Sequence, residues 1–291
     1  IYPLINIVSG QRIEGMDFGN NCTDCDANLA SPVDDRFTIE QGMTLTVDAP
    51  GVQLNDTIAS GTTLSSVVNE TVSHGTLTLN DDGSFAYQPD SKFLGTDFFT
   101  YHLTDGTAVT ETAVVTIAVT YPLDLVAGWN AISIPVQLDG PDVDTVFANA
   151  DFIGTIWEWT GTEFVEADTV EPDKGYWLYI SSERGSLTVQ IEGDSIPAKA
   201  LDLQPNWNFI GVTRATNAAD IVDVAPIIWG WNPEVDVFER IGRNAVLEPG
   251  VGYWVLSTVA DQRDIHPPIA GYVFNDASDG DARDDTDAER R

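Results

Sequence analysis

The chain has 291 residues, enough for about two or three domains, and its 43% hydrophobic content is typical of folded domains with buried cores. Its 46 acidic residues against 13 lysines and arginines give a formal net charge of −33, which argues against sequence-independent nucleic-acid binding and against anionic membrane surfaces. So many carboxylates repel one another unless cations are present, so we expect calcium at some of them; for any single Asp, a solvated acidic surface is the alternative.

The N-terminal segment SGQRIEGMDFGN, from Ser9 to Asn20, resembles the last strand of a B-type repeat domain of serine-aspartate-repeat adhesins. The resemblance implies that residues 1–22 are the terminal strand of such a sandwich. Cys22 and Cys25 are the only cysteines and open a predicted linker over 23–32. Two thiols lack the further ligands of a zinc site and the histidine of a haem attachment, so we predict a local disulfide, with two reduced thiols as the alternative.

Residues 33–120 are predicted to form strands, because apolar and polar residues alternate between turn residues every 8 to 12 positions. Residues 76–79 and 84–87 are expected to pair as a hairpin around the turn sequence NDDG at 80–83. Residues 114–119 read as a closing strand. His74 and His102 fall in this region, where they look structural.

Five motifs of this region are PVDDRFT from Pro32, GVQLND from Gly51, SHGTL from Ser73, DGSFAY from Asp82 and GTDFFTY from Gly95. Together they resemble the bacterial cadherin-like, immunoglobulin-like tandem domain. The resemblance implies a sandwich of about seven strands, carried in tandem on large surface and secreted proteins, with interdomain calcium in some members. By that analogy the candidate calcium ligands are Asp34, Asp35, Asn55, Asp56 and Asp105. The alternative is that these Asp and Asn residues only form turns.

The next region is an internal duplication. LDL and GWNAISI from Leu123 return 78 residues later as LDL and NWNFIGV from Leu201, and IWEW and EPDKGYW return in the same order as IWGW and EPGVGYW. Both copies resemble a Gly-Trp-Asn module of bacterial and archaeal cell-surface proteins. We predict repeat 1 over 121–198 and repeat 2 over 199–260, each too small to bury its own apolar face and packed on its twin. Only 141–150 and 218–224 could carry a short helix.

Each repeat carries a pair of tryptophans two residues apart, which face the same side of a strand. The pairs are Trp157 with Trp159 and Trp229 with Trp231. Such an indole face could stack on carbohydrate, or it could pack in a core between the copies. We favour the core, because both copies keep what both need to fold.

The C-terminal segment IAGYVFND, from Ile269 to Asp276, resembles the first strand of the B-type domain, which in that family leads into a calcium loop. The resemblance implies that 261–291 is the opening of a further such domain. Its candidate ligands are Asp276, Ser278, Asp279, Asp281, Asp284, Asp285, Asp287 and Glu289. The order Asp-Gly-Asp at 279–281 departs from the Gly-Asp-Gly of the family.

We find no phosphate loop, nucleophile elbow or zinc-protease motif, so we predict no enzymatic activity. The expected fold is all-β, a string of sandwich modules with a duplicated small β module. The expected function is an extracellular structural protein: a segment or subunit of a cell-surface fibre stabilised by calcium, associating with itself or with neighbouring domains of a longer chain, with assembly by strand complementation as one route. The alternative is a carbohydrate-binding adhesin. We expect no nucleic-acid partner and no membrane insertion.

Overall fold

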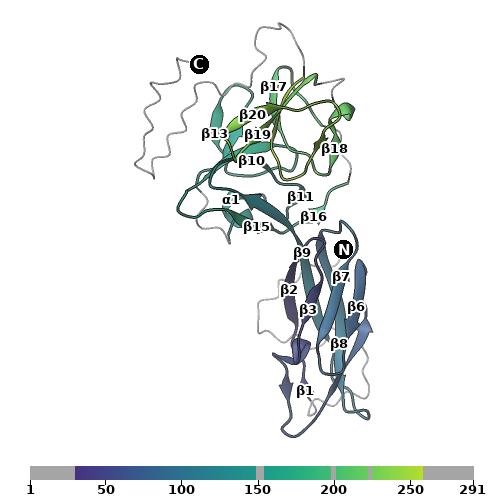
Figure 1. The fold of residues 1–291 in the computed structure, drawn as a ribbon. Coiled ribbons are helices and arrows are strands. Elements are labelled where there is room, and N and C mark those ends of the chain that lie inside the picture. Colours follow the sequence, from purple (N-terminus) through teal and green to yellow (C-terminus); the bar gives the residue numbers. More distant parts are fainter. Residues whose placement is uncertain (1–29, 149–153, 198–200, 222–224, 258–291) are drawn as a thin grey trace, which may run out of the picture. The chain divides into compact units, whose positions relative to one another are not determined.

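The structure is a computed structural model that describes residues 30–148, 154–197, 201–221 and 225–257 (Figure 1). Strands dominate the described residues, which confirms the predicted all-β class. Within the same ranges, no helix is long and apolar enough to span a membrane. The predicted disulfide of Cys22 and Cys25, the terminal strand within 1–22 and the acidic loop within 261–291 lie outside the described residues.

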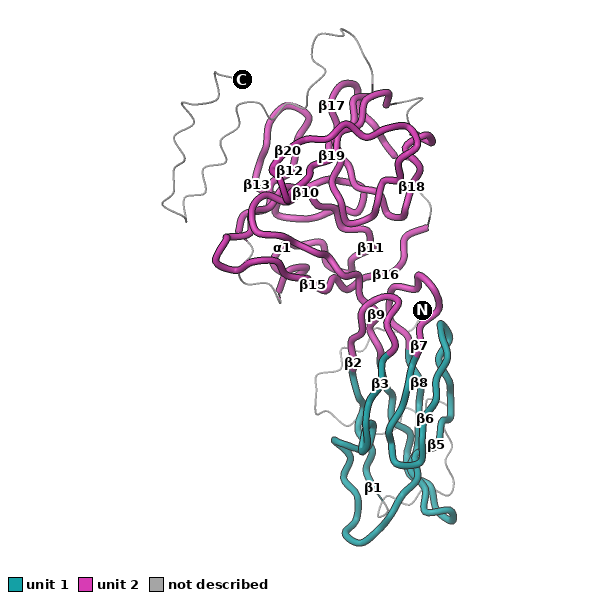
Figure 2. The backbone as a smooth tube through the Cα atoms, in the orientation of Figure 1, with its two compact units in different colours: residues 1–36, 45–87, 98–116 teal, residues 37–44, 88–97, 117–291 magenta. Residues whose placement is uncertain are grey.

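The chain divides into two compact units, shown in teal and magenta in Figure 2. Unit 1 contains residues 1–36, 45–87 and 98–116, and unit 2 contains residues 37–44, 88–97 and 117–291. Most of the predicted sandwich therefore lies in unit 1, and both repeats lie in unit 2.

The strands of the sandwich include the predicted hairpin and the predicted closing strand. They are β1 (Ala30–Ser31), β2 (Asp35–Glu40), β3 (Leu45–Val47), β4 (Thr57–Ile58), β5 (Ser65–Glu70), β6 (Gly75–Leu79), β7 (Phe85–Pro89), β8 (Gly95–Thr104) and β9 (Ala113–Leu125), with a short 3-10 helix η1 (Gly51–Gln53). One sheet has the order β3-β7-β6. The other has the order β15-β9-β8-β5, where β15 is Leu187–Ile191, and β2 also pairs with β9.

The sandwich core of unit 1 forms because strand residues alternate in direction. Along β8, the odd-numbered positions from Gly95 to Leu103 are all buried, while the residues between them are more exposed. Phe99 of β8 meets Phe85 of β7 edge to face, with ring centroids 5.5 Å apart. The predicted hairpin is confirmed: β6 and β7 are neighbours, and the Asn80 N–H donates to Ser84 O across the turn.

A close backbone contact fixes the loop that follows β3. The Val52 N–H donates to Gly83 O over 3.0 Å. A Cβ on Gly51 would lie 1.9 Å from that oxygen, and Gly51 has φ +54°, so only glycine fits there. The hairpin turn and η1 are thereby held together, which positions the Asn55–Asp56 segment directly after η1.

The two repeats share the topology of their four-stranded sheets. Repeat 1 contains β10 (Gly128–Ser133), β11 (Val136–Gln137), α1 (Val143–Val146), β12 (Trp157–Trp159), β13 (Phe164–Glu166), β14 (Gly175–Ile180) and β16 (Asp194–Ser195). Repeat 2 contains β17 (Trp207–Ile210), β18 (Thr216–Asn217), η2 (Ala218–Asp220), β19 (Ile227–Asn232), β20 (Val237–Arg240), β21 (Val246–Leu247) and β22 (Tyr253–Leu256). The sheet orders, β10-β14-β12-β13 and β17-β22-β19-β20, correspond strand for strand. Both short helical turns fall where the sequence allowed them.

The Gly-Trp-Asn motif is a turn closed by its asparagine. Asn130 accepts from Val126 N–H and donates to the carbonyl oxygens of Val126 and Gly128. Asn208 repeats these three bonds in repeat 2. Gly128 has φ +100°, and Asn206, its counterpart, has φ +77°, a conformation that Gly and Asn tolerate best.

The second shared motif, Glu-Pro-x-x-Gly-Tyr-Trp, is held by its tyrosine. The Tyr176 hydroxyl accepts from the Glu171 N–H over 2.7 Å, and the Tyr253 hydroxyl accepts from the Glu248 N–H over 2.9 Å. Burial raises the pKa of both phenols. The repeated residues are thus the ones that close turns or fill the interior.

Candidate functional site

Most of the predicted acidic ligands of unit 1 lie close together, near the first residues of β2 and of β4. Asp34 and Asp35 stand at the start of β2, and Asn55 and Asp56 lie between η1 and β4. Asp56 Oδ1 accepts from Val33 N–H over 2.8 Å, and Asn55 Nδ2 donates to Asp34 O over 3.1 Å. Four of the five predicted residues therefore form one group, called here the acidic cluster: Asp34, Asp35, Asn55 and Asp56.

Asp35 is the least satisfied member of the acidic cluster. Its Oδ2 atom is buried and has no hydrogen-bond partner. Burial and, after it, the charges of Asp56 and Asp34 raise the pKa of Asp35 to about 7, against hydrogen bonds from Asn55 and Tyr101 that lower it. A carboxylate held in this way gains from any positive charge that reaches it.

Tyr101 completes the cluster, although it was not among the residues predicted from the sequence. Its hydroxyl lies 2.7 Å from Val52 O and 2.9 Å from Asp56 Oδ2. Burial raises the pKa of this phenol well above its ordinary value, and the charge of Asp56 adds to the effect. The alternation along β8 could have identified it, because a tyrosine on the buried face of a strand needs a partner for its hydroxyl.

The cluster carboxylates also bond the backbone around them. Asp34 Oδ1 accepts from the Val114 N–H of β9 over 2.8 Å. Burial raises the pKa of Asp56, although its bonds from Val33 and Tyr101 oppose that rise. The group is therefore held between three segments of unit 1: the start of β2, the loop after η1 and β9.

Asp105 is occupied elsewhere. Its Oδ1 accepts from the N–H groups of Thr107 and Ala108, at 2.8 and 2.9 Å, so it closes the turn after β8. These backbone bonds lower the pKa of its carboxyl group. For this residue the structure shows the turn that was the alternative to calcium binding.

The fit of the acidic cluster to a metal ion is mixed. Among the described residues, no three His, Cys, Asp or Glu side chains are arranged as they stand to hold a metal ion. The buried, unpartnered Oδ2 of Asp35 and the oxygen chemistry of its neighbours nevertheless suit a hard cation such as calcium. Of the acidic cluster, Asp34, Asp35, Asn55 and Asp56 are the residues that could hold it.

The predicted tryptophan pairs lie in a second place, in unit 2. Trp157, Trp159, Trp229 and Trp231 are all partly buried and pack against a core of Phe164, Trp177, Phe209 and Trp254. Trp159 Nε1 donates to Trp207 O over 3.3 Å, and Trp231 Nε1 donates to Trp129 O over 2.7 Å. Each of these two bonds joins one repeat to the other. We call this group of rings the aromatic interface.

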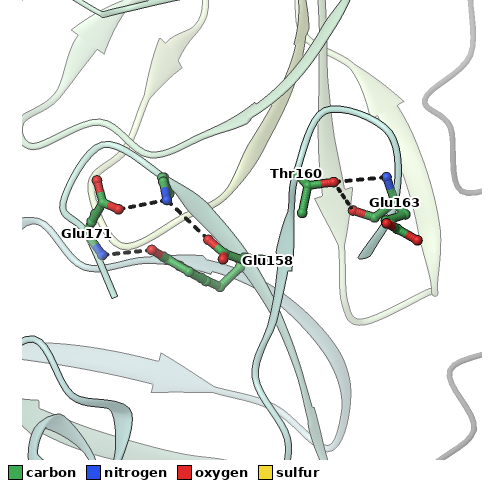
Figure 3. A network of polar contacts seen from close by, with 6 residues as sticks. Glu158, Thr160, Glu163 and Glu171 are labelled. Atoms are coloured by element: carbon green, nitrogen blue, oxygen red, sulfur yellow. Dashed lines mark hydrogen bonds and ion pairs between the residues drawn. The ribbon is translucent and has the colours of Figure 1, made fainter. Parts of the chain in front are cut away.

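A charged network in repeat 1 joins Glu158 of β12 to the segment before β14 (Figure 3). Lys174 Nζ lies 2.7 Å from Glu171 and 3.2 Å from Glu158 of β12. In repeat 2, Gly230 and Val251 stand where repeat 1 has Glu158 and Lys174. Because these side chains are partly exposed, such pairs contribute little to stability.

Comparison with known proteins bears on the sandwich. Residues 28–121 match the family model of the bacterial cadherin-like domain, in agreement with the range 33–120 predicted from the sequence. Domains of this kind are typical of extracellular and surface proteins, which points to an adhesive or structural role for this part of the chain. The resemblance of 121–260 to the Gly-Trp-Asn module, and of the two ends to B-type domains, stays a prediction.

The other comparisons add little. No curated protein matches the chain. Among solved structures, the chain is similar to the endo-fucoidan hydrolase from glycoside hydrolase family 107, with a TM-score of 0.26 and 13% identity. That similarity covers 62% of this chain and 26% of the hydrolase chain, so this chain spans about a quarter of it. A likeness of this size supports no conclusion about fold or activity.

Proposed function

We propose that the chain is a non-enzymatic segment of an extracellular or cell-surface structural protein, whose cadherin-like sandwich binds calcium at the acidic cluster. The cadherin-like match over 28–121 supports the surface role. The observation that carries the calcium proposal is the buried Oδ2 of Asp35, which lacks a partner and stands near two further carboxylates.

The physical reason is electrostatic. Asp35 has its pKa raised to about 7 by burial and by Asp56 and Asp34, so its ionised form is disfavoured in the folded chain. A bound cation would offset that repulsion and would stabilise the folded sandwich in proportion to its occupancy. Modules that work outside the cell bind calcium with dissociation constants of about 0.1 to 1 mM, so a weak site of this kind suits that setting.

Isothermal titration of the whole chain with calcium chloride tests the site. We expect Asp35→Asn to lose one binding event relative to the parent chain. Asp82→Asn is the matched control: it removes one carboxylate charge too, but from an exposed turn where Asp82 bonds Ser84. Calcium binding that is the same in all three proteins would refute the acidic cluster as the site, whatever other acidic segments bind.

We further propose that the protein acts by self-association into a fibre, or as one part of a longer chain of modules. The unit-2 duplication supports a role in building length and shape, since repeated modules serve such purposes. Electron microscopy of the purified protein, with calcium and with a chelator, tests this. Ordered fibres that lose their order in chelator support a calcium-braced assembly, and isolated particles under both conditions contradict it.

The carbohydrate-binding adhesin has less support. Its four tryptophans are partly buried, and Trp159 and Trp231 donate their indole N–H groups to the opposite repeat. Rings held in this way stabilise the pair of repeats instead of offering a free face for sugar. Titration with oligosaccharides, followed by tryptophan fluorescence, would detect such binding.

A further inference from the structure

The two repeats are related by a pseudo-twofold axis, because their contacts are reciprocal. Besides the two indole bonds, the Ser133 N–H donates to Gly250 O and the Gly211 N–H donates to Asp173 O, each over 3.0 Å. Ser133 and Gly211 are 78 residues apart and occupy equivalent positions in the two repeats. An interface of this kind uses the same face of both partners.

Phe209 breaks this symmetry. Its ring stacks on Trp177 of repeat 1, with centroids 5.6 Å apart and planes at 19°, and on Trp254 of repeat 2, at 4.8 Å and 16°. Trp177 and Trp254 are themselves equivalent residues. A ring that stacks on both lies between them, close to the pseudo-twofold axis.

Two equivalent glycines make room for that ring. A Cβ on Gly175 would lie 2.9 Å from Phe209 Cγ, and a Cβ on Gly252 would lie 2.8 Å from Phe209 Cζ. One side chain therefore touches the same feature of both repeats. One phenyl ring fills the space beside the axis. It fits only because Gly175 and Gly252 have no side chains.

The counterpart of Phe209 in repeat 1 is Ala131. The strand registers establish the equivalence: Ala131 pairs with Trp177 across β10 and β14, and Phe209 pairs with Trp254 across β17 and β22. Ala131 also packs against the aromatic interface. The pair thus combines one large and one small side chain at a position where symmetry would place two of a kind.

We propose that Phe209 and Ala131 determine which faces can pair: a repeat face with Phe at this position accepts only a face with a small residue there. Two Phe-bearing faces would bring two rings into the space of one, and two Ala-bearing faces would leave a cavity between Trp177 and Trp254. Repeat 2 therefore takes repeat 1 as its partner and rejects a second repeat 2. The same rule selects the partner if repeats pair between two copies of this chain.

A double-mutant cycle in the full chain tests the proposal. We expect Phe209→Ala and Ala131→Phe each to lower the melting temperature of the paired repeats by on the order of 10 °C. The double variant, Ala131→Phe with Phe209→Ala, returns one ring to the axis from the opposite strand. We expect it to recover more than half of the loss, with the near-ultraviolet circular dichroism of the stacked rings restored.

The control places the same ring elsewhere. Val237 on β20 is 44% exposed, so Val237→Phe adds a ring away from the axis. Combined with Phe209→Ala, it should recover nothing. Rescue by Ala131→Phe but not by Val237→Phe supports the pairing rule. If the swapped double variant loses as much melting temperature as the two single variants together, the rule is wrong. The melting temperature of the double variant is measured directly, so the test still works if the Ala131→Phe chain folds poorly.

Discussion

The acidic cluster of unit 1 and the aromatic interface of unit 2 are stabilised in opposite ways. In the acidic cluster, Asp35 keeps a buried oxygen without a partner and its neighbours repel it. In the aromatic interface, the stacked and edge-to-face rings fill the space between two repeats. The indole N–H groups of Trp159 and Trp231 find carbonyl acceptors, while those of Trp177 and Trp254 are buried without a partner but carry no charge.

The two regions therefore respond differently to pH and to divalent ions. Burial of apolar rings changes little with pH or with divalent ions, because no charge is gained or lost. A crowded set of carboxylates changes with both. We therefore expect the stability of the sandwich to depend on calcium and pH, and the stability of the paired repeats to depend on how well their side chains pack.

The largest effect is expected from Trp254→Ala. This indole is 1% exposed and stacks on Phe209, so its loss leaves a large cavity in the aromatic interface. We expect the free energy of unfolding of the repeats to fall by about 3 to 5 kcal/mol, measured by urea denaturation followed by fluorescence. Val237→Ala, at an exposed position of the same repeat, should change it by less than about 0.5 kcal/mol.

Tyr101→Phe is expected to weaken the sandwich by about 1 to 3 kcal/mol, because it removes the one O–H donor that lies between Val52 O and Asp56 while the ring stays in place. Thermal unfolding of the sandwich gives the measure. An unchanged sandwich would show that the hydroxyl contributes nothing, and Trp254→Ala should leave this transition where it is.

Gly128→Ala should cost about 1 to 2 kcal/mol, because its φ of +100° is unfavourable for a residue with a Cβ. Asn206→Gly is the matched change at the equivalent position of repeat 2. Since glycine adopts φ +77° without strain, we expect the free energy of unfolding to change by only a few tenths of a kcal/mol. Equal losses at the two positions would mean that the turns are not equivalent.

The smallest effect concerns pH. Asp35 has an ordinary pKa of 3.8 and a folded-state pKa of about 7, so the folded chain binds more protons than the unfolded chain between these values. Without divalent ions, the contribution of this group to stability therefore falls as pH rises from about 4 to about 7, and is flat above. Solvent screening of a partly exposed group keeps it small. Asp35→Asn should lose this slope in a series of urea titrations; an identical slope in both chains would contradict it.

Much of the fold could be predicted from the sequence. The hairpin over 76–87 and the closing strand followed from alternation and turn residues. The helical turns α1 and η2 fell inside the segments expected, but η1 at Gly51–Gln53 was not predicted. The repeat motifs also identified the residues that close turns, because duplicated structural requirements leave duplicated residues. Asn130 and Asn208 are examples.

The sites were harder to predict. The motif placed Asp105 with the other candidate ligands, but only the structure shows its bonds to Thr107 and Ala108. Tyr101 was missed because its place in the strand pattern is that of a core residue. Only the structure shows that its hydroxyl bonds Asp56. The role of Phe209 depends on stacking between residues of two repeats, and a sequence comparison shows that position only as a mismatch with Ala131.

The most direct test of the contrast is differential scanning calorimetry of the full chain at pH 7.5, with calcium and with a chelator. The transition lowered by Tyr101→Phe identifies the sandwich, and the one lowered by Trp254→Ala identifies the paired repeats. We predict that calcium raises the melting temperature of the sandwich and leaves that of the paired repeats unchanged. If both transitions move by the same amount, or if the sandwich does not respond, the contrast between the two regions is wrong.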